Sequence, residues 1–169
     1  MALTRPQGNI VMKLGTEQAS TSGTAIDFTG IPAGTTMIII QLFGVSTNGT
    51  SPYLVQLGDA GGFETTGYLG GNSYVGSSSA GANSTAGLLL TSGAAVAVSI
   101  VCHGSVILTL EDSTQFSWVG QVIIGRSDDA FHFFGAASKS LTQELSQVRI
   151  TTANGTDAFD AGAINIAYF

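Results

Sequence analysis

Three pairs of acidic residues are the clearest candidates for chemistry in this sequence. They are Glu111 with Asp112, Asp128 with Asp129, and Asp157 with Asp160. Two carboxylates that face each other across a cleft can hydrolyse a glycoside, and one pair could hold Ca²⁺, although no complete EF-hand pattern is present. All three pairs lie in turn-like sequence, where the backbone itself favours Asp. We therefore interpret them as turn residues, with catalysis and Ca²⁺ binding as alternatives.

Other catalytic or metal sites find less support. His103 and His132 are the only histidines, and neither has a second ligand at metal spacing, so we expect structural roles. Cys102 is the only cysteine, which excludes an internal disulfide and predicts a small buried apolar residue. Residues 76–81 and 58–62 match neither a serine nucleophile motif nor a phosphate loop. The sequence predicts no enzyme, no metal and no cofactor.

The composition points away from nucleic acid and towards contacts between subunits. The chain has 169 residues, a formal net charge of −6 and only 9% charged residues, against about 25% in ordinary soluble domains. Binding to phosphate needs clustered basic residues, and this chain has five Lys and Arg in all. Interface cores are depleted of charge. We therefore expect an oligomer that does not bind nucleic acid.

One long stretch resembles a membrane segment because it has no charged residue between Glu64 and Glu111. Residues 91–93 and 103–104 interrupt it, which leaves apolar runs shorter than the ~20 residues of a spanning helix. The N-terminus lacks the continuous apolar core of a signal peptide. We expect no membrane insertion, and assembly in a reducing cytoplasm.

Apolar residues alternate with a period of two along much of the chain, which predicts β-strands. Residues 96–102 and 106–110 show this pattern on either side of His103-Gly104, which we interpret as a hairpin turn. Residues 37–43 are apolar on both faces, which predicts a central strand covered by a second sheet or a neighbouring subunit. Further strands are expected at residues 9–14, 25–28, 53–57, 116–124, 131–134, 147–151 and 163–169.

Turn signals separate these strands about every ten residues, which is typical of a sandwich or jelly roll. We therefore predict an all-β protein. An antiparallel, jelly-roll-like β-sandwich would span residues 25–169, after an N-terminal arm or extended segment over residues 1–24. Residues 70–85 are rich in Gly, Ser, Ala and Asn and are expected to form a long surface loop.

An ordered series of motifs begins at Ser22. It reads SGTAIDFTGIPAG, then GVSTNGTS, then QLGDAGGFETTGY, and FSWV follows at residues 116–119. The series resembles a module of bacteriophage tail-fibre proteins and small virion structural proteins. The resemblance implies an all-β fold, a location on the virion surface, other virion proteins as partners and a homotrimer. It carries no catalytic residue to this chain.

Two non-enzymatic functions are the leading expectations. A tail-fibre or appendage adhesion module would bind host-surface glycan or protein through exposed loops, with Tyr68, Asn72 and Tyr74 as candidate ligand-binding residues and loop packing as their alternative role. A capsid decoration protein, acting as cement or head fibre, would clamp head subunits through flat, uncharged sheet surfaces and the N-terminal arm. An enzyme acting on host polysaccharide is the third alternative.

The strand at residues 37–43 predicts where subunits of a trimer meet. Its side chains form two sets that point in opposite directions: Met37, Ile39 and Phe43 on one side, and Ile38, Ile40 and Leu42 on the other. A single core covers only one set. We expect the other to lie in the subunit interface, with a second sheet of the same domain as the alternative cover.

Overall fold

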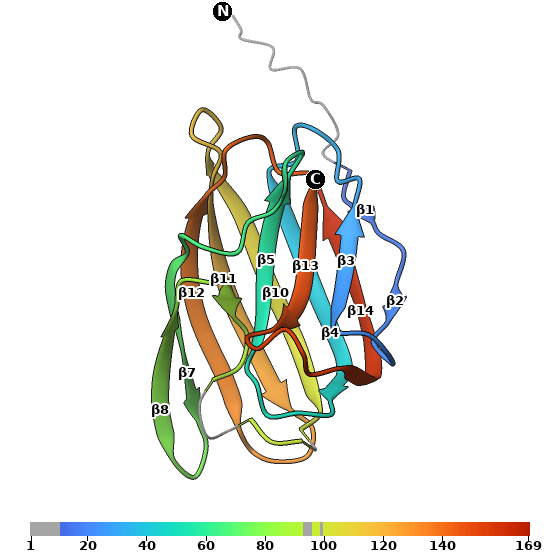
Figure 1. The fold of residues 1–169 in the computed structure, drawn as a ribbon, viewed down its shortest axis with the longest axis vertical. Coiled ribbons are helices and arrows are strands. Elements are labelled where there is room, and N and C mark those ends of the chain that lie inside the picture. Colours follow the sequence, from blue (N-terminus) through green and yellow to red (C-terminus); the bar gives the residue numbers. More distant parts are fainter. Residues whose placement is uncertain (1–10, 93–95, 99) are drawn as a thin grey trace, which may run out of the picture.

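The fold is a sandwich of two antiparallel sheets (Figure 1), and the computed structural model describes residues 11–92, 96–98 and 100–169. The large sheet has nine strands, in the order β1 (Lys13–Leu14), β14 (Phe159–Tyr168), β4 (Met37–Thr47), β10 (Cys102–Asp112), β11 (Ser117–Arg126), β12 (His132–Ser140), β7 (Leu69–Val75) and β8 (Ser79–Ser84), with β2 (Gln18–Ala19) beside β14. The small sheet has five, in the order β3 (Ala25–Thr29), β13 (Gln147–Thr152), β5 (Tyr53–Asp59) and β6 (Gly62–Phe63), with β9 (Leu88–Leu89) beside β5. The predicted antiparallel β-sandwich is confirmed, while the jelly-roll connectivity stays a prediction.

The core lies between the two sheets and is built by the predicted alternation. On β4, Ile38, Ile40 and Leu42 are buried against the small sheet, whose β13 contributes Val148 and Ile150. Burying an aliphatic side chain of this size stabilises the fold by about 1.5–3 kcal/mol relative to leaving it exposed. The second sheet therefore covers this set, and the opposite set on β4 faces away from the core.

The predicted hairpin at His103-Gly104 is wrong, because β10 continues through both residues. The strand predicted at residues 96–102 is wrong as well, because Cys102 is the only one of its described residues that lies in a strand. Gly104 has a φ of 144°, and a Cβ at this position would overlap the carbonyl oxygen of Ile123 on the neighbouring strand. The pairing of β10 with β4 also shifts register between Cys102 and Gly104. The glycine therefore serves a β-bulge with close backbone approach, which resembles a turn signal in sequence.

The predicted surface loop at residues 70–85 is also wrong, because this segment forms the hairpin of β7 and β8. Its glycines permit close strand contact: a Cβ at Gly70 would overlap Ala137 of β12. Asn72 and Tyr74 alternate with these small residues and point into the core. Small residues mark a tightly paired strand here, although their composition is equally typical of a loop.

The described part of the predicted arm, residues 11–24, lies along the edge of the large sheet. Leu14 pairs with Ala167, and Gln18 pairs with Ile164, both on β14. The Ser20 hydroxyl donates a hydrogen bond of 2.8 Å to the carbonyl oxygen of Ala161. Residues 1–10, which include the start of the strand predicted at residues 9–14, lie outside the described residues.

The stretch that resembled a membrane segment contributes β7, β8, β9 and most of β10. Its residues 93–95 and 99 lie outside the described residues. Across the described ranges, no helix has the length and hydropathy needed to span a membrane.

Candidate functional site

The prediction that all six acidic residues lie in turns is wrong for three of them, because Glu111 and Asp112 are the last residues of β10 and Asp160 lies on β14. Asp112 accepts hydrogen bonds from the hydroxyl and amide of Thr114 and from the amide of Gln115, and these bonds lower the pKa of its carboxyl. In the second pair, the Arg126 guanidinium lowers the pKa of Asp128. In the third, a hydrogen bond from the Asn154 amide does the same for Asp157. A general acid needs the opposite shift, so these contacts account for the three carboxylates as structural groups.

The two histidines lie on one face of the large sheet. His103 and His132 both pair with Gly125, from the strands on either side of it. The His103 ring lies over that glycine, and its Nδ1 is 2.8 Å from the hydroxyl oxygen of Ser127. Within the part of the chain that the structure describes, no group of three or more His, Cys, Asp or Glu could hold a metal ion.

Cys102 is buried and unpaired, and burial raises the pKa of its thiol to about 12. A thiol with this pKa stays protonated at neutral pH and is a poor nucleophile. The residue packs as a small apolar side chain, as its sequence context predicts.

The three predicted ligand-binding residues are all buried. The Tyr68 hydroxyl accepts a hydrogen bond of 2.7 Å from the Leu57 amide and donates one of 3.0 Å to the Glu64 carbonyl oxygen. The Asn72 amide donates to the carbonyl oxygens of Leu89 and Leu90 and accepts from the Ser92 hydroxyl. Tyr74 packs its ring against Phe131 and Phe133. These contacts give all three side chains a role in packing between the sheets.

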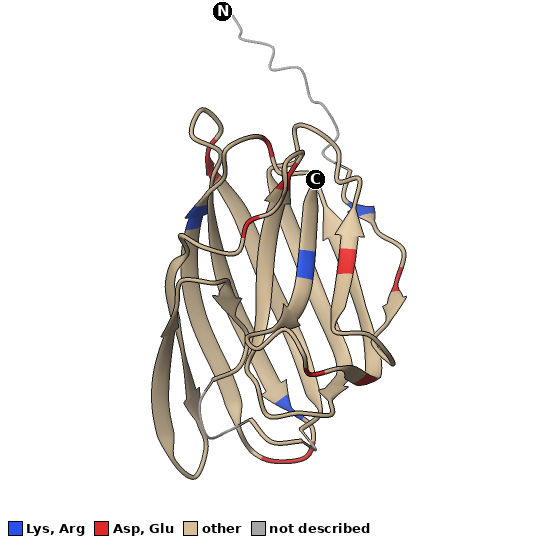
Figure 2. Cartoon of the chain, viewed as in Figure 1, with Lys and Arg blue, Asp and Glu red and all other residues tan. Residues whose placement is uncertain are grey.

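The outward side of the large sheet, called here the outer face, consists of the side chains of β14, β4, β10, β11, β12, β7 and β8 that point away from the core. Figure 2 shows charged residues in loops, near strand ends and on β3 and β13, with the middle of these seven strands free of them. One row across the outer face contains Asn165, Gln41, Ser105, Ile123, Phe134, Ser73 and Gly81. The next row contains Ala167, Ile39, Ile107, Gln121, Ala136, Gly71 and Asn83.

Large apolar side chains are exposed on this face. Phe43 is 79% exposed, Ile123 71% and Phe134 46%, and Leu69 is exposed at the end of β7. Isolated exposed apolar residues are common, but a group of them on an uncharged face indicates a surface that contacts another molecule. The outer face is therefore the candidate functional surface.

A groove of about 770 Å³ lies on the half of the outer face formed by β11, β12, β7 and β8. Two rows of four outward residues make it, and the backbone of the same strands completes its lining. The rows are Gln121, Ala136, Gly71 and Asn83, and Ile123, Phe134, Ser73 and Gly81. Small residues form its floor, and Phe134, Ile123 and the two amides are its large side chains. Its volume falls in the range of small-molecule sites, about 300–1,000 Å³.

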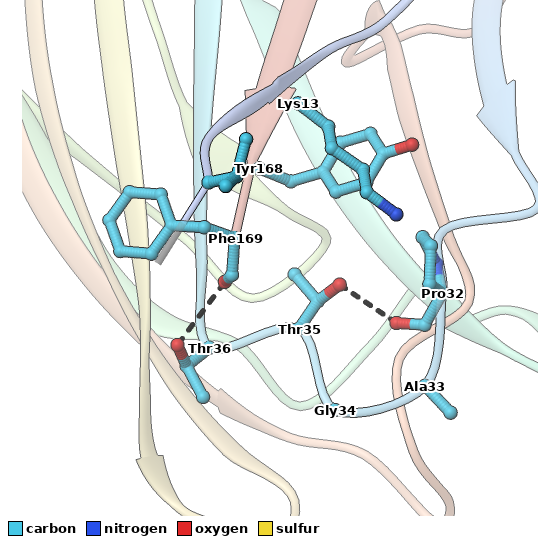
Figure 3. A pocket seen from close by; sticks show the side chains of 9 residues that line it. Lys13, Pro32, Ala33, Gly34, Thr35, Thr36, Tyr168 and Phe169 are labelled. Carbon is cyan, nitrogen blue, oxygen red and sulfur yellow. Dashed lines mark hydrogen bonds between the residues drawn. The ribbon is translucent and has the colours of Figure 1, made fainter. Parts of the chain in front are cut away.

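A second hollow, of about 410 Å³, lies beside the C-terminal end of β14 (Figure 3). Lys13, Tyr168, Phe169 and the loop of residues 32–36 line it. Two of its hydroxyl groups are bonded within the protein: the Thr36 hydroxyl donates to the carbonyl oxygen of Phe169, and the Thr35 hydroxyl donates to that of Pro32. These bonds give the hollow a role in joining the loop to β14.

Comparison with known proteins found no matching family model, no similar curated protein and no similar solved structure.

Sequence reasoning did not identify the groove residues. Ile123 and Phe134 stand at outward positions between core residues of the same strands. The residue types of Ile123 and Phe134 could have indicated a binding surface, because a large apolar residue at an outward position is unusual on a strand with one solvated face. Gln121 and Asn83 carried no comparable signal.

Proposed function

We propose that this chain is a structural subunit of the bacteriophage virion surface, and that it acts as an adhesion module of a tail fibre or appendage that binds the host surface. The observation that carries the proposal is the uncharged outer face with its exposed Phe43, Ile123 and Phe134. The phage context rests on the resemblance of residues 22–68 to tail-fibre and small virion proteins. Such a subunit would be assembled in the host cytoplasm and displayed on the particle.

The scaffold beneath this face supports a binding function in preference to catalysis. Asp112, Asp128 and Asp157 are hydrogen-bonded within the chain, and the motif residues Asp59 and Tyr68 are buried and bonded within the sandwich. Rigid β-scaffolds that present a binding surface are common among recognition proteins. The groove gives the outer face a defined place for a ligand.

The proposal includes a homotrimer whose subunits meet through the outer face at β14, β4 and β10. Ile38, Ile40 and Leu42 are buried in the sandwich, which leaves Met37, Ile39 and Phe43 available for a neighbouring subunit. The number three rests on the resemblance.

A second candidate function is capsid decoration, in which the same face would clamp head subunits as a cement or head-fibre protein. The low charge of the outer face favours it. The groove favours adhesion, because a surface that only clamps subunits does not need a hollow lined with amides.

Immunogold labelling of intact phage particles with antibodies against the purified chain tests the proposal. Label at the tips of tail fibres or other appendages is the expected result. Label spread over the head would replace adhesion by decoration. Particles that do not contain the chain would overturn both functions.

A further inference from the structure

We propose that the groove on β11, β12, β7 and β8 binds a neutral oligosaccharide. This inference rests on the proposed adhesion function and specifies its ligand. The two rows of outward residues that line the groove would contact the ligand. The side chains of Tyr68, Asn72 and Tyr74 would not touch it, since all three are buried.

The residues that line the groove all lie in the described ranges, and none of them is Asp, Glu, Lys or Arg. A phosphorylated or acidic ligand would need basic partners, and an amine would need carboxylates. The groove matches a ligand that carries hydroxyl groups and no charge.

The polar side chains in the groove are of the types that bind hydroxyl groups. Gln121, Ser73 and Asn83 come from three different strands, and each amide can donate and accept at the same time. Asn83 lies across Gly71, where a Cβ would come within 2.7 Å of its Oδ1. The absence of a side chain at Gly71 therefore lets the Asn83 amide extend over β7 towards the middle of the groove.

The apolar side chains supply a stacking surface beside these amides. Phe134 is 46% exposed and lies next to Ile123, so part of its ring is available to a ligand. The C–H side of a sugar ring packs on an aromatic ring, while its hydroxyl groups point to the surrounding amides. Aromatic contacts of this kind give both orientation and affinity.

The shape of the groove suits an extended ligand. It crosses four strands, or about 14 Å at ~4.8 Å per strand. Gly71, Gly81, Ala136 and Ser73 keep the floor low, so that a flat chain can approach the sheet closely. A short oligosaccharide lying across the strands fits these dimensions. Of the four groove strands, β11, β12 and β7 are already paired on both sides, and β8 at the end of the sheet is the one with an edge to which a peptide strand could pair.

The test uses the purified full chain on an array of neutral and anionic oligosaccharides, followed by titration calorimetry with the neutral compound that gives the strongest signal. Binding to neutral compounds is expected, with little change between 50 mM and 500 mM NaCl because no charge pair is formed. Phe134→Ala should weaken binding about tenfold, and Phe134→Tyr should retain it. Ala136→Leu should abolish it by filling the floor.

Leu69→Ala is the matched control, because Leu69 is an exposed apolar residue of the same face outside the groove, and it should bind as the unmodified chain does. Thermal unfolding of every variant separates loss of fold from loss of binding. Preference for anionic compounds, no binding to any neutral compound, or binding that survives both Phe134→Ala and Ala136→Leu in folded protein would overturn the proposal. If label still marks the appendages in those cases, the adhesion function stands and only its ligand class is wrong.

Discussion

Ile123 on β11 and Phe134 on β12 are direct cross-strand partners on the outer face, and they are 71% and 46% exposed. A cross-strand pair of an aromatic and a β-branched residue stabilises a sheet by about 0.2–1 kcal/mol. The adjoining positions in the same strands, Ile124 and Phe133, are fully buried in the core. The sheet therefore carries apolar pairs on both sides, and only the inner side is covered by this chain's own second sheet.

Self-association through β4 predicts that Phe43→Lys shifts the protein towards monomers. A charge at a position that is 79% exposed in the subunit should be tolerated by the fold but not in an apolar interface. Thr29→Lys is the control, since Thr29 is exposed on the small sheet. Light scattering at micromolar concentration measures the change. A soluble monomer before any substitution would contradict the interface.

The bulge at Gly104 predicts a large loss of stability for Gly104→Ala. The new Cβ would overlap backbone atoms of Ile123 and Ile124, so β10 and β11 must separate. We expect a loss of about 2–4 kcal/mol in the free energy of unfolding, measured with urea. Gly30→Ala is the control: its φ is 73°, but a Cβ there meets open space, and it should cost only about 1 kcal/mol. Equal losses in both variants would mean that Gly104 lies in an open turn.

Burial of Tyr68 predicts that Tyr68→Phe affects stability and leaves binding unchanged. The hydroxyl bonds to Leu57 and Glu64 of its own chain, so its loss leaves a buried amide without its acceptor. We expect a loss of about 1–3 kcal/mol in the free energy of unfolding. Glycan affinity of the folded variant should equal that of the parent chain. A variant with full stability and reduced affinity would show that the tyrosine contacts the ligand.

The hydrogen bonds to the Asp59 carboxylate predict that the folded protein loses stability in acid. Burial alone would raise its pKa, but hydrogen bonds from Thr142, Gly61 and Gln143 together lower it. A carboxyl with a lowered pKa in the folded state stabilises the protein above its unfolded pKa of about 3.9, and this contribution disappears as the pH falls through the folded pKa. Stability should therefore fall below about pH 4.

Asp59→Asn should cost about 1–3 kcal/mol at pH 7, because an amide group replaces one of the accepting oxygens, and it should flatten the acid limb of the stability profile. Asp160→Asn is the control, since Asp160 is exposed on β14. Denaturant unfolding between about pH 2 and about pH 8 measures the stability of both variants, and this range extends to either side of the unfolded pKa of about 3.9. An unchanged acid limb in Asp59→Asn would assign the acid sensitivity to other carboxyls.

Strand positions followed from the sequence at most segments of strong apolar alternation, with residues 96–101 as the exception, since none of those that the structure describes lies in a strand. The strands at residues 25–28, 37–43, 53–57 and 147–151 are all present, because alternation directly reports which side chains face the core. Glycine was the source of two errors, the predicted hairpin at His103-Gly104 and the predicted loop at residues 70–85. Gly104 and Gly70 serve close backbone approach, and nothing local distinguishes that use from a turn, because the neighbouring strand that requires it lies far along the chain.

The candidate site was less predictable than the fold. The groove combines outward residues of β7, β8, β11 and β12, and β8 is separated from β11 by more than thirty residues of sequence. Their juxtaposition depends on β7 pairing with β12, a long-range contact without a sequence signature. The composition of the sequence around Tyr74 favours a surface position for its ring, yet the alternation of side chains on β7 points the ring into the core.

The number of copies of this chain per virion tests the central claim most directly. Quantitative mass spectrometry of purified particles, normalised to the major capsid protein, measures it. The adhesion function predicts from a few to a few dozen copies, in multiples of three for a homotrimer carried on tail appendages. Hundreds of copies would assign the chain to the decoration of the head, and its absence from the particle would contradict the virion surface function altogether.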